Sequence, residues 1–371
     1  MLDYAPRIIL GPKVGKVTAV PTLIPNVAKL QVRSFGRERE SIWDEYVHQN
    51  PGATPFHLSA WKRTIEKVFP FESRYMVAEA QGAICGVLPL FFVKNLLSGR
   101  ALISSPFAVY GGICADDAES GNLLRQAACE MAQQEDAEYL ELREQTTISD
   151  VNFHTKKLYV TFDQALPESA EGLLQGFPRD TRYMIRKAQK NGLRAVVDNS
   201  QMDIFYEIYA HSVHQLGTPV FSRKFFRTLG EEFGEQCEIM VVWHGGRAMA
   251  AVLSLKFRDS IFPYYGGSVP EGRALAANNF MYWELMKRAL ETGIRYFDFG
   301  RSKLGTGAYA FKKQWNMRER PLPYQYYLVR RREMPNYSPA NSRFQLATKA
   351  WKRVPFPLTK VLGPVLVRLF P

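Results

Sequence analysis

The chain has 371 residues and a formal net charge of +12, with 46% hydrophobic and 13% aromatic residues. These proportions are those of a folded globular protein, and at roughly 150 residues per domain they allow two domains with extensions. The most apolar run, residues 83–93, is interrupted by Pro89, whereas a membrane-spanning helix needs about 20 apolar residues. We therefore expect neither a long disordered chain nor a membrane-spanning one.

The first residues, Met1-Leu2-Asp3, include an acid and precede no apolar core of the roughly 7–15 residues that a secretory signal needs. The sequence therefore predicts a cytoplasmic protein. Its four cysteines have no CxxC spacing and its six histidines are scattered, so we expect reduced thiols and no metal site.

The positive charge is concentrated at one end of the chain. Residues 301–371 contain 15 Lys and Arg against two acids, whereas residues 1–300 are nearly neutral. One surface or tail is therefore expected to contact an anionic partner. Phosphates of a substrate, a tRNA and an inner-membrane surface all fit.

The sequence contains an internal repeat, residues 74–112 and 238–267, in which strands and turns end in Tyr-Gly-Gly. A helix follows each copy, at 119–136 and 279–291, and then a short alternating strand, at 138–143 and 295–301. This order predicts an α+β fold of two tandem domains with mixed, mostly antiparallel sheets, flanking helices and a cleft between them. The expected units are an extended arm (1–30), two domains (31–175 and 176–334) and a basic apolar tail (335–371).

The tail contains short apolar and basic pieces, 351–358 and 362–370, broken by prolines. Two interpretations fit this composition. The tail either lies at an interface with a membrane or partner, or folds back onto the protein body.

Residues 180–192 read as a helix, with Asp180 or Thr181 at its start and Gly192 at its end. Spacing of i, i+4 and i+8 places three cations along one stripe of this helix: Arg182, Arg186 and Lys190. Guanidinium groups bind phosphate oxygens bidentately, so the stripe is a candidate phosphate site. The alternative is a solvated basic face.

The run 297–315 reads as a strand that includes Asp298 and Arg301, then a loop with three glycines, then a short helix beginning near Tyr309. Backbone amides of such a loop can hold an anion or an oxyanion. No Gly-x-x-x-x-Gly-Lys-Ser/Thr phosphate loop is present. The helix supplies two lysines within reach of the same place, Lys312 and Lys313.

Several segments resemble FemAB-type proteins, which are tandem GNAT-fold acyltransferases: Ile-Arg-Lys-Ala-Gln-Lys-Asn-Gly-Leu at 185–193, Tyr-Tyr-Gly-Gly-Ser at 264–268, Asn-Asn-Phe-Met-Tyr-Trp-Glu at 278–284 and Phe-Asp-Phe-Gly-Arg-Ser at 297–302 followed by Phe-Lys-Lys at 311–313. The resemblance covers roughly residues 30–334. It implies two GNAT domains, transfer of an acyl or aminoacyl group to an amine, and no permanently bound cofactor. In well-understood members the donor is aminoacyl-tRNA and the acceptor a peptidoglycan precursor.

The stretch Gly-Arg-Ser-Lys-Leu-Gly-Thr-Gly at 300–307, together with the basic tail, is similar to the FemAB-related branch found with exosortase/PEP-CTERM and exopolysaccharide systems. The resemblance places Phe311 and Lys312 near the transfer centre and a phosphate-binding position on Arg182 or Arg186. The remaining expected substrate-binding residues are Lys190, Tyr265, Asn278, Asn279, Tyr309 and Lys313.

We expect Lys312 to stabilise an oxyanion or the leaving group. Asp298 has two interpretations: it orients Arg301 or accepts a proton through water, or it forms only a strand-end ion pair with Arg301. Tyr265 lines an acyl slot or belongs to the core. No Ser/His/Asp or Cys/His arrangement is evident, so we expect no covalent acyl-enzyme.

Residues 271–279 lack the Arg/Gln-x-x-Gly-x-Gly/Ala turn with which classical GNAT proteins grip the pyrophosphate of acetyl-CoA. This departure argues against an ordinary acetyl-CoA donor. Two alternatives remain open. One is N-acylation of an amino sugar from acyl-CoA or an acyl carrier protein, and the other is a non-catalytic scaffold whose basic tail docks on polysaccharide machinery or RNA.

Overall fold

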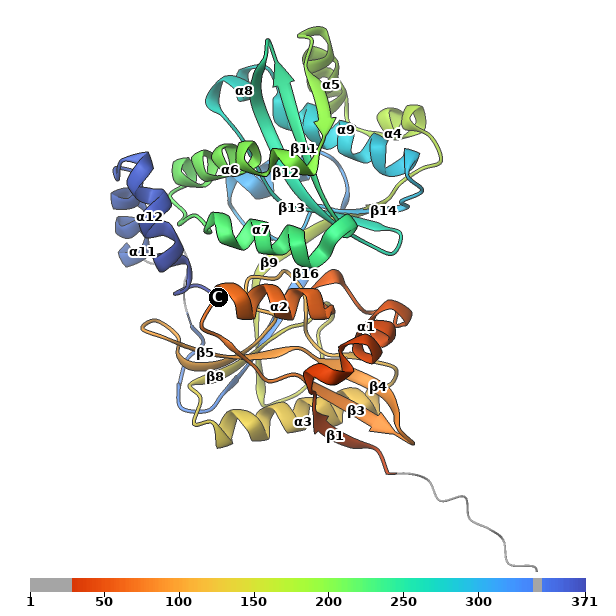
Figure 1. Ribbon diagram of the computed structural model, residues 1–371, viewed down its shortest axis with the longest axis vertical. Helices are drawn as coiled ribbons and strands as arrows, with labels where there is room; N and C mark the ends of the chain where they lie inside the picture. Colours follow the sequence, from red (N-terminus) through yellow and green to blue (C-terminus); the bar gives the residue numbers. More distant parts are fainter. Residues whose placement is uncertain (1–28, 336–341) are drawn as a thin grey trace, which may run out of the picture.

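The computed structural model describes residues 29–335 and 342–371, which form two halves stacked one above the other (Figure 1). The N-terminal half contains β1 (Gln31–Ser34), α1 (Glu40–Gln49), α2 (Ser59–Val68), β2 (Glu72–Ser73), β3 (Met76–Ala80), β4 (Ala83–Leu88), β5 (Leu90–Asn95), β6 (Gly99–Ser104), β7 (Cys114–Ala115), α3 (Ala118–Gln134) and β8 (Tyr139–Arg143). The C-terminal half contains α4 (Ala170–Gly176), α5 (Arg179–Lys190), β10 (Arg194–Val197), α6 (Met202–Leu216), α7 (Arg223–Phe233), β11 (Cys237–His244), β12 (Arg247–Phe257), β13 (Ser260–Ser268), α8 (Pro270–Ala274), α9 (Ala277–Glu291), β14 (Tyr296–Asp298), β15 (Ser302–Lys303) and α10 (Gly307–Lys313).

One large sheet runs through both halves, in the order β10-β11-β12-β13-β14-β9-β16-β8-β6-β5-β2, and a small sheet has the order β1-β3-β4-β7. The two strands at the centre of the large sheet, β9 (Phe153–Ala165) and β16 (Arg318–Leu328), pair antiparallel with each other. β14 extends the sheet from β9, and β8 extends it from β16. These two long strands therefore join the halves into one structure.

The expected α+β repeat is present. In each half a tight turn joins two antiparallel strands, β3–β4 and β11–β12, and a long helix, α3 or α9, precedes a strand that pairs in parallel, as in β6–β8 and β13–β14. The halves differ at Pro89, which separates β4 in the small sheet from β5 in the large one, so the apolar run 83–93 forms two strands and not one. Proline lacks the N–H that would continue a ladder.

The two Tyr-Gly-Gly motifs also differ. Tyr265-Gly266-Gly267 lies in β13, whereas Tyr110-Gly111-Gly112 lies in a loop after β6. A side chain at Gly267 would place its Cβ 2.3 Å from the side chain of Ser212 on α6. The motif thus allows α6 to approach the sheet closely in the C-terminal half.

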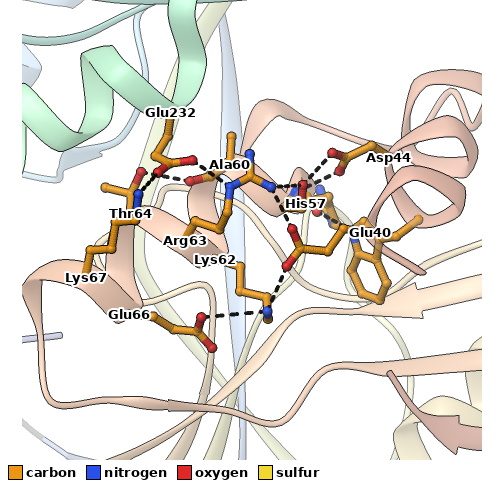
Figure 2. A network of polar contacts seen from close by, with 12 residues as sticks. Glu40, Asp44, His57, Ala60, Lys62, Arg63, Thr64, Glu66, Lys67 and Glu232 are labelled. Atoms are coloured by element: carbon orange, nitrogen blue, oxygen red, sulfur yellow. Dashed lines mark hydrogen bonds and ion pairs between the residues drawn. The ribbon is translucent and has the colours of Figure 1, made fainter. Parts of the chain in front are cut away.

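An aromatic core connects the halves where α2 packs against α7. Trp61 of α2 lies edge-on to Phe225 and Phe233 of α7, with ring centroids 6.4 and 6.5 Å apart. An ion-pair network covers the edge of this contact (Figure 2). Arg63 Nε lies 2.5 Å from Glu232 of α7, and its Nη1 lies 2.7 Å from Glu40.

The tail folds back onto the body as α11 (Ser342–Trp351) and α12 (Phe356–Val367), beside α6 (Figure 1). Trp351 Nε1 donates to the carbonyl of Thr218 at 3.2 Å, and Lys360 Nζ lies 3.0 Å from Glu207 on α6. Residues 1–28 of the expected N-terminal arm lie outside the described residues. Within the part of the chain that the structure describes, no helix is both long and apolar enough to cross a membrane.

Candidate active site

A cavity opens where two parallel strands of the C-terminal half separate. β13 pairs with β14 only at Ser260 and Ile261, and beyond these residues the strands diverge. The pairing of β12 with β13 shifts register so that Tyr264 has no partner opposite it. The gap is a cavity of about 560 Å³, lined on one side by residues 263–266 and on the other by residues 299–301. Residues 217–219 and the tail complete its wall.

Lys312, in α10, lines this cavity and is half-buried. Its Nζ donates to three main-chain carbonyls, those of Phe299, Gly300 and Arg301, at 2.6, 2.9 and 3.3 Å. Burial lowers the pKa of Lys312 to about 8, an effect that Asp298 opposes and Arg301 reinforces. An ammonium group has three donors, so Lys312 uses all of them to hold the loop between β14 and β15.

Arg301 lies on the same loop and also lines the cavity. Its Nη1 donates to the Tyr324 hydroxyl at 3.2 Å, and its guanidinium lies over the ring of Tyr159 at 4.8 Å. Among the described residues it forms no ion pair with a carboxylate. A half-buried guanidinium held by aromatic rings retains donors for an anionic ligand.

A second cavity, of about 190 Å³, lies on the other side of Arg301, in the N-terminal half. It is lined by three cations, Arg143, Lys156 and Arg301, and by one acid, Glu141. Arg143 Nε lies 2.9 Å from Glu141, and burial lowers the pKa of Lys156. This second cavity is therefore electropositive and suits a phosphate or a similar anion.

Arg143 fills the position in the N-terminal half that the large cavity occupies in the C-terminal half. β6 and β8 pair in parallel over residues 101–103, and the side chain of Arg143 follows where they separate. Its Nη1 donates to the carbonyls of Ser105 and Ala108 at 3.1 and 2.9 Å. The corresponding gap is thus largely closed by a buried side chain.

Asp298 is buried and does not line either cavity. Its carboxylate accepts hydrogen bonds from the Tyr110 hydroxyl at 2.5 Å, from Thr161 Oγ1 at 2.7 Å and from the Gly300 N–H at 2.7 Å. Burial raises the pKa of Asp298, and these hydrogen bonds oppose the rise. A strand-end ion pair with Arg301, one of the two interpretations of Asp298, is not among its described contacts. Asp298 instead links β14 to the N-terminal half.

Tyr265 lies in the cavity wall and is 8% exposed. Its ring packs edge-on against Tyr264 and Phe226, at 4.6 and 5.1 Å, so it belongs to the core as well. Its hydroxyl has no hydrogen-bond partner among the described residues. A buried unpaired hydroxyl carries a desolvation cost, which a ligand in the cavity would relieve.

The cationic stripe lies away from both cavities. α5 packs against α9 on the outer face of the C-terminal half (Figure 1). Arg182 donates to the Gln175 carbonyl at 3.2 Å, and Arg186 and Lys190 are exposed. The structure therefore shows these residues on a solvated basic face, and none of the three lines a described cavity.

The other expected residues also lie outside the cavity walls. The Tyr309 hydroxyl lies 3.2 Å from both Glu319 and Lys313 Nζ at the surface. Phe311 packs against Tyr282 and Trp315 in the core of the C-terminal half. Asn278 and Asn279 lie in the first turn of α9, where Asn279 is buried.

Sequence reasoning missed the residues that β8, β9 and β16 bring to the site: Arg143, Lys156, Tyr159 and Tyr324. No local motif marks them. The available signal was a charged residue, Arg143, in a short strand with alternating apolar positions. Where its side chain lies in the folded protein depends on strands that are distant in the sequence.

A cavity between two separating parallel strands, in a chain that repeats the unit, defines a tandem GNAT-fold protein. Residues 176–313 match the family model described as an acetyltransferase (GNAT) domain. The comparison with curated proteins found no match.

Solved structures share the fold along most of the chain. FemX has a TM-score of 0.65 and 16% identity, over 81% of this chain and 98% of that one. The C-terminal domain of a putative lysylphosphatidylglycerol synthetase from Agrobacterium fabrum has a TM-score of 0.52 and 14% identity, over 84% and 95%. A tandem GNAT protein from the clavulanic acid biosynthesis pathway has a TM-score of 0.50 and 12% identity, over 80% and 98%. The chain thus has the tandem GNAT fold, as the sequence predicts.

Proposed function

We propose that this protein is an N-acyltransferase of FemAB type, which transfers an acyl or aminoacyl group to an amine of a phosphate-bearing cell-envelope or exopolysaccharide precursor. The observation that carries the proposal is the shared wall of the two cavities. Arg301 lines both, with Lys312 on one side and the electropositive cavity on the other. One cavity suits the reacting groups, and the other suits an anionic part of a substrate.

In the proposed reaction the acceptor amine attacks the carbonyl carbon of an ester or thioester. The new C–N bond forms, the C–O or C–S bond breaks, and the proton lost by the amine goes to the leaving oxygen or sulfur. Holding both reactants in one cavity can lower the activation free energy by roughly 7–11 kcal/mol. Lys312 releases its longest hydrogen bond, 3.3 Å to the Arg301 carbonyl, to contact the developing oxyanion.

The donor is proposed to be an aminoacyl-tRNA, with acyl-CoA or an acyl carrier protein as the alternative. The loop before α9 supports the preference for aminoacyl-tRNA over acyl-CoA. It consists of the short helix α8, Leu275 and Ala276, with Ala276 in the left-handed region at φ 60°. A glycine-rich pyrophosphate turn is missing from this loop.

Substitution of Lys312 tests the catalytic proposal. Lys312→Ala should reduce transfer by about 100-fold or more, because removing one oxyanion donor typically has an effect of this size. Transfer is measured from a pool of mixed radiolabelled aminoacyl-tRNA or from labelled acetyl-CoA to UDP-linked amino sugars. Lys287→Ala, on α9 outside the cavity walls, is the matched control and should retain activity.

Ligand binding separates the enzyme from a scaffold. A ligand at about 100 times its Kd stabilises the native state by about 2.7 kcal/mol, which a thermal-shift measurement detects. Lys312→Ala should keep this stabilisation while losing transfer. Stabilisation of the wild type without transfer to any acceptor would favour the non-catalytic alternative, and stabilisation by acetyl-CoA alone would favour the acyl-CoA donor.

A further inference from the structure

The helix α12 is apolar on two opposite faces, but the body of the protein covers only one. Its buried face includes Gly363 and Val367, and a Cβ at Gly363 would lie 2.8 Å from the main-chain nitrogen of Val220. Its opposite face, spaced i, i+3, i+4 and i+7, is exposed by 46–69% at Leu358, Val361, Leu362 and Val365. Contiguous exposed apolar side chains on one face of a helix mark a surface that contacts a partner or a membrane.

The neighbouring helix α11 also exposes an apolar residue and cations. Leu346 is 68% exposed, and the end of α11 and the following turn expose Lys349, Lys352 and Arg353. Arg368, after α12, is exposed as well. We call these residues, with the exposed face of α12, the tail surface.

The charge of the tail surface indicates what covers it. The tail surface as defined contains four cations, Lys349, Lys352, Arg353 and Arg368, and no acid. Two copies of this surface would repel each other, which disfavours self-association. An apolar stripe with adjacent cations and no acids is the composition of helices that lie in the interface of anionic membranes.

We propose that the tail surface docks the protein on the surface of an anionic phospholipid bilayer, with the apolar face of α12 among the acyl chains and the cations at the headgroups. The docking is peripheral. It is independent of the transfer chemistry, so it stands or fails separately from the proposed function.

The position of the tail connects docking to the site. Val367, Phe370 and Pro371 line the large cavity, and Phe370 and Pro371 also line the electropositive one. Arg143 Nη2 donates to the main-chain oxygen of Pro371 at 2.7 Å. Docking through α12 therefore holds the walls of both cavities next to the bilayer, where a lipid-linked acceptor would be presented. This consequence for the substrate class rests on the proposed function.

Sedimentation of the full chain with vesicles tests the docking. Binding to vesicles of phosphatidylcholine mixed with phosphatidylglycerol should exceed binding to phosphatidylcholine alone, and added salt should weaken it. Val361→Asp should reduce the affinity for the mixed vesicles by about tenfold or more, because it places a charge on the inserted face. Val151→Asp, at a fully exposed position in the loop before β9, is the matched control and should bind like the wild type.

Charge reversal provides a second test. Lys352→Glu with Arg353→Glu should weaken binding by roughly 30-fold or more, since loss of each cation near an anionic surface removes about a factor of five and the two new carboxylates are repelled by that surface. Lys187→Glu with Arg194→Glu, both exposed on the far side of the C-terminal half, should have little effect. Unchanged thermal unfolding of each variant shows that the fold is intact.

Three results would overturn the proposal. The first is equal binding of the wild type and the tail variants to mixed vesicles. The second is a dimer in analytical ultracentrifugation that Val361→Asp dissociates, which would mean that a second copy covers the tail surface. The third is the absence of vesicle binding at low salt.

Discussion

Lys312 combines two features in the wall of the large cavity. Its ammonium is saturated by three carbonyl oxygens, and yet burial lowers its pKa to about 8. The carbonyls hold the Lys312 ammonium in a fixed place. Because its pKa is lowered, the ammonium loses its proton close to neutral pH. A group of this kind can be charged and well oriented when a negative charge develops beside it.

The pH dependence of transfer should show this lowered pKa. Below about pH 8 the lysine carries its charge, and above that value it loses the charge, so kcat/KM should fall as the pH rises through about 8. Lys312→Arg should remove this alkaline limb, because a guanidinium stays charged. The pH dependence of kcat/KM is measured with the donor at saturation. An alkaline limb that is identical in Lys312→Arg would assign the titration to another group.

Sequence reasoning brought Lys312 and Arg301 together because both lie in one short run between a strand and a helix. It did not place Arg143 and Lys156 beside them, because they come from strands about 150 residues away in the sequence. The stripe of Arg182, Arg186 and Lys190 is a regular helical pattern, but the pattern alone does not say whether the stripe faces solvent or a cavity. Ile185 and Ala188 determine the packed face by their burial, and it is opposite the stripe.

At the scale of elements, α2 and α7 form the main helical contact between the halves. Their aromatic contact is bordered by the network around Arg63, which bridges Glu40 and Glu232 (Figure 2). The Arg63 side chain is 36% exposed, whereas the Glu232 side chain is only 9% exposed. Burial favours neutralisation of Glu232, but hydrogen bonds from Arg63 and Lys67 outweigh this and lower its pKa.

Arg63→Met should therefore lower the free energy of unfolding by about 1–2 kcal/mol, between the effect of an exposed ion pair and that of a buried one. Urea denaturation measures the change. Lys67→Met, which removes a more exposed partner of the same Glu232, is the control and should cost less. A double-mutant cycle with Glu232→Gln should give a coupling energy for Arg63, and a coupling near zero would contradict the bridging role.

The helix α9 follows its sequence prediction, residues 279–291, closely. The central strands β9 and β16 were not predicted. Pro321 and Pro323 in β16 argue against a central strand from sequence alone. In the structure Pro321 pairs with β9 only, before β8 joins on the other side at Tyr324, and Pro323 lies at a register shift. Each proline thus lies where no ladder N–H is needed.

At the scale of the whole molecule, the large sheet is shared, so neither half contains all of its strands. β9 and β16 contribute hydrogen bonds to strands of both halves. Calorimetry should therefore give a single unfolding transition with equal calorimetric and van't Hoff enthalpies. An excised segment of residues 176–313, which matches the GNAT domain but lacks both central strands, should not fold.

Two separate transitions, or a folded excised segment with dispersed amide resonances, would contradict this cooperativity. The expected domain boundary at residues 175 and 176 stays a prediction of sequence organisation. It falls within α4, just after β9 leaves the shared sheet.

The place of β16 in the sheet also sets an order of events during synthesis. About 150 residues separate β9 from β16, and ribosomes add roughly 5–20 residues per second, so the gap between β9 and β8 stays open for about 8–30 s. During that time the facing edges of β8 and β9 carry unpaired backbone groups, which are sites for association with other chains. The nascent chain must therefore be shielded until its last strand arrives, and neither cavity has its full wall before the tail leaves the ribosome.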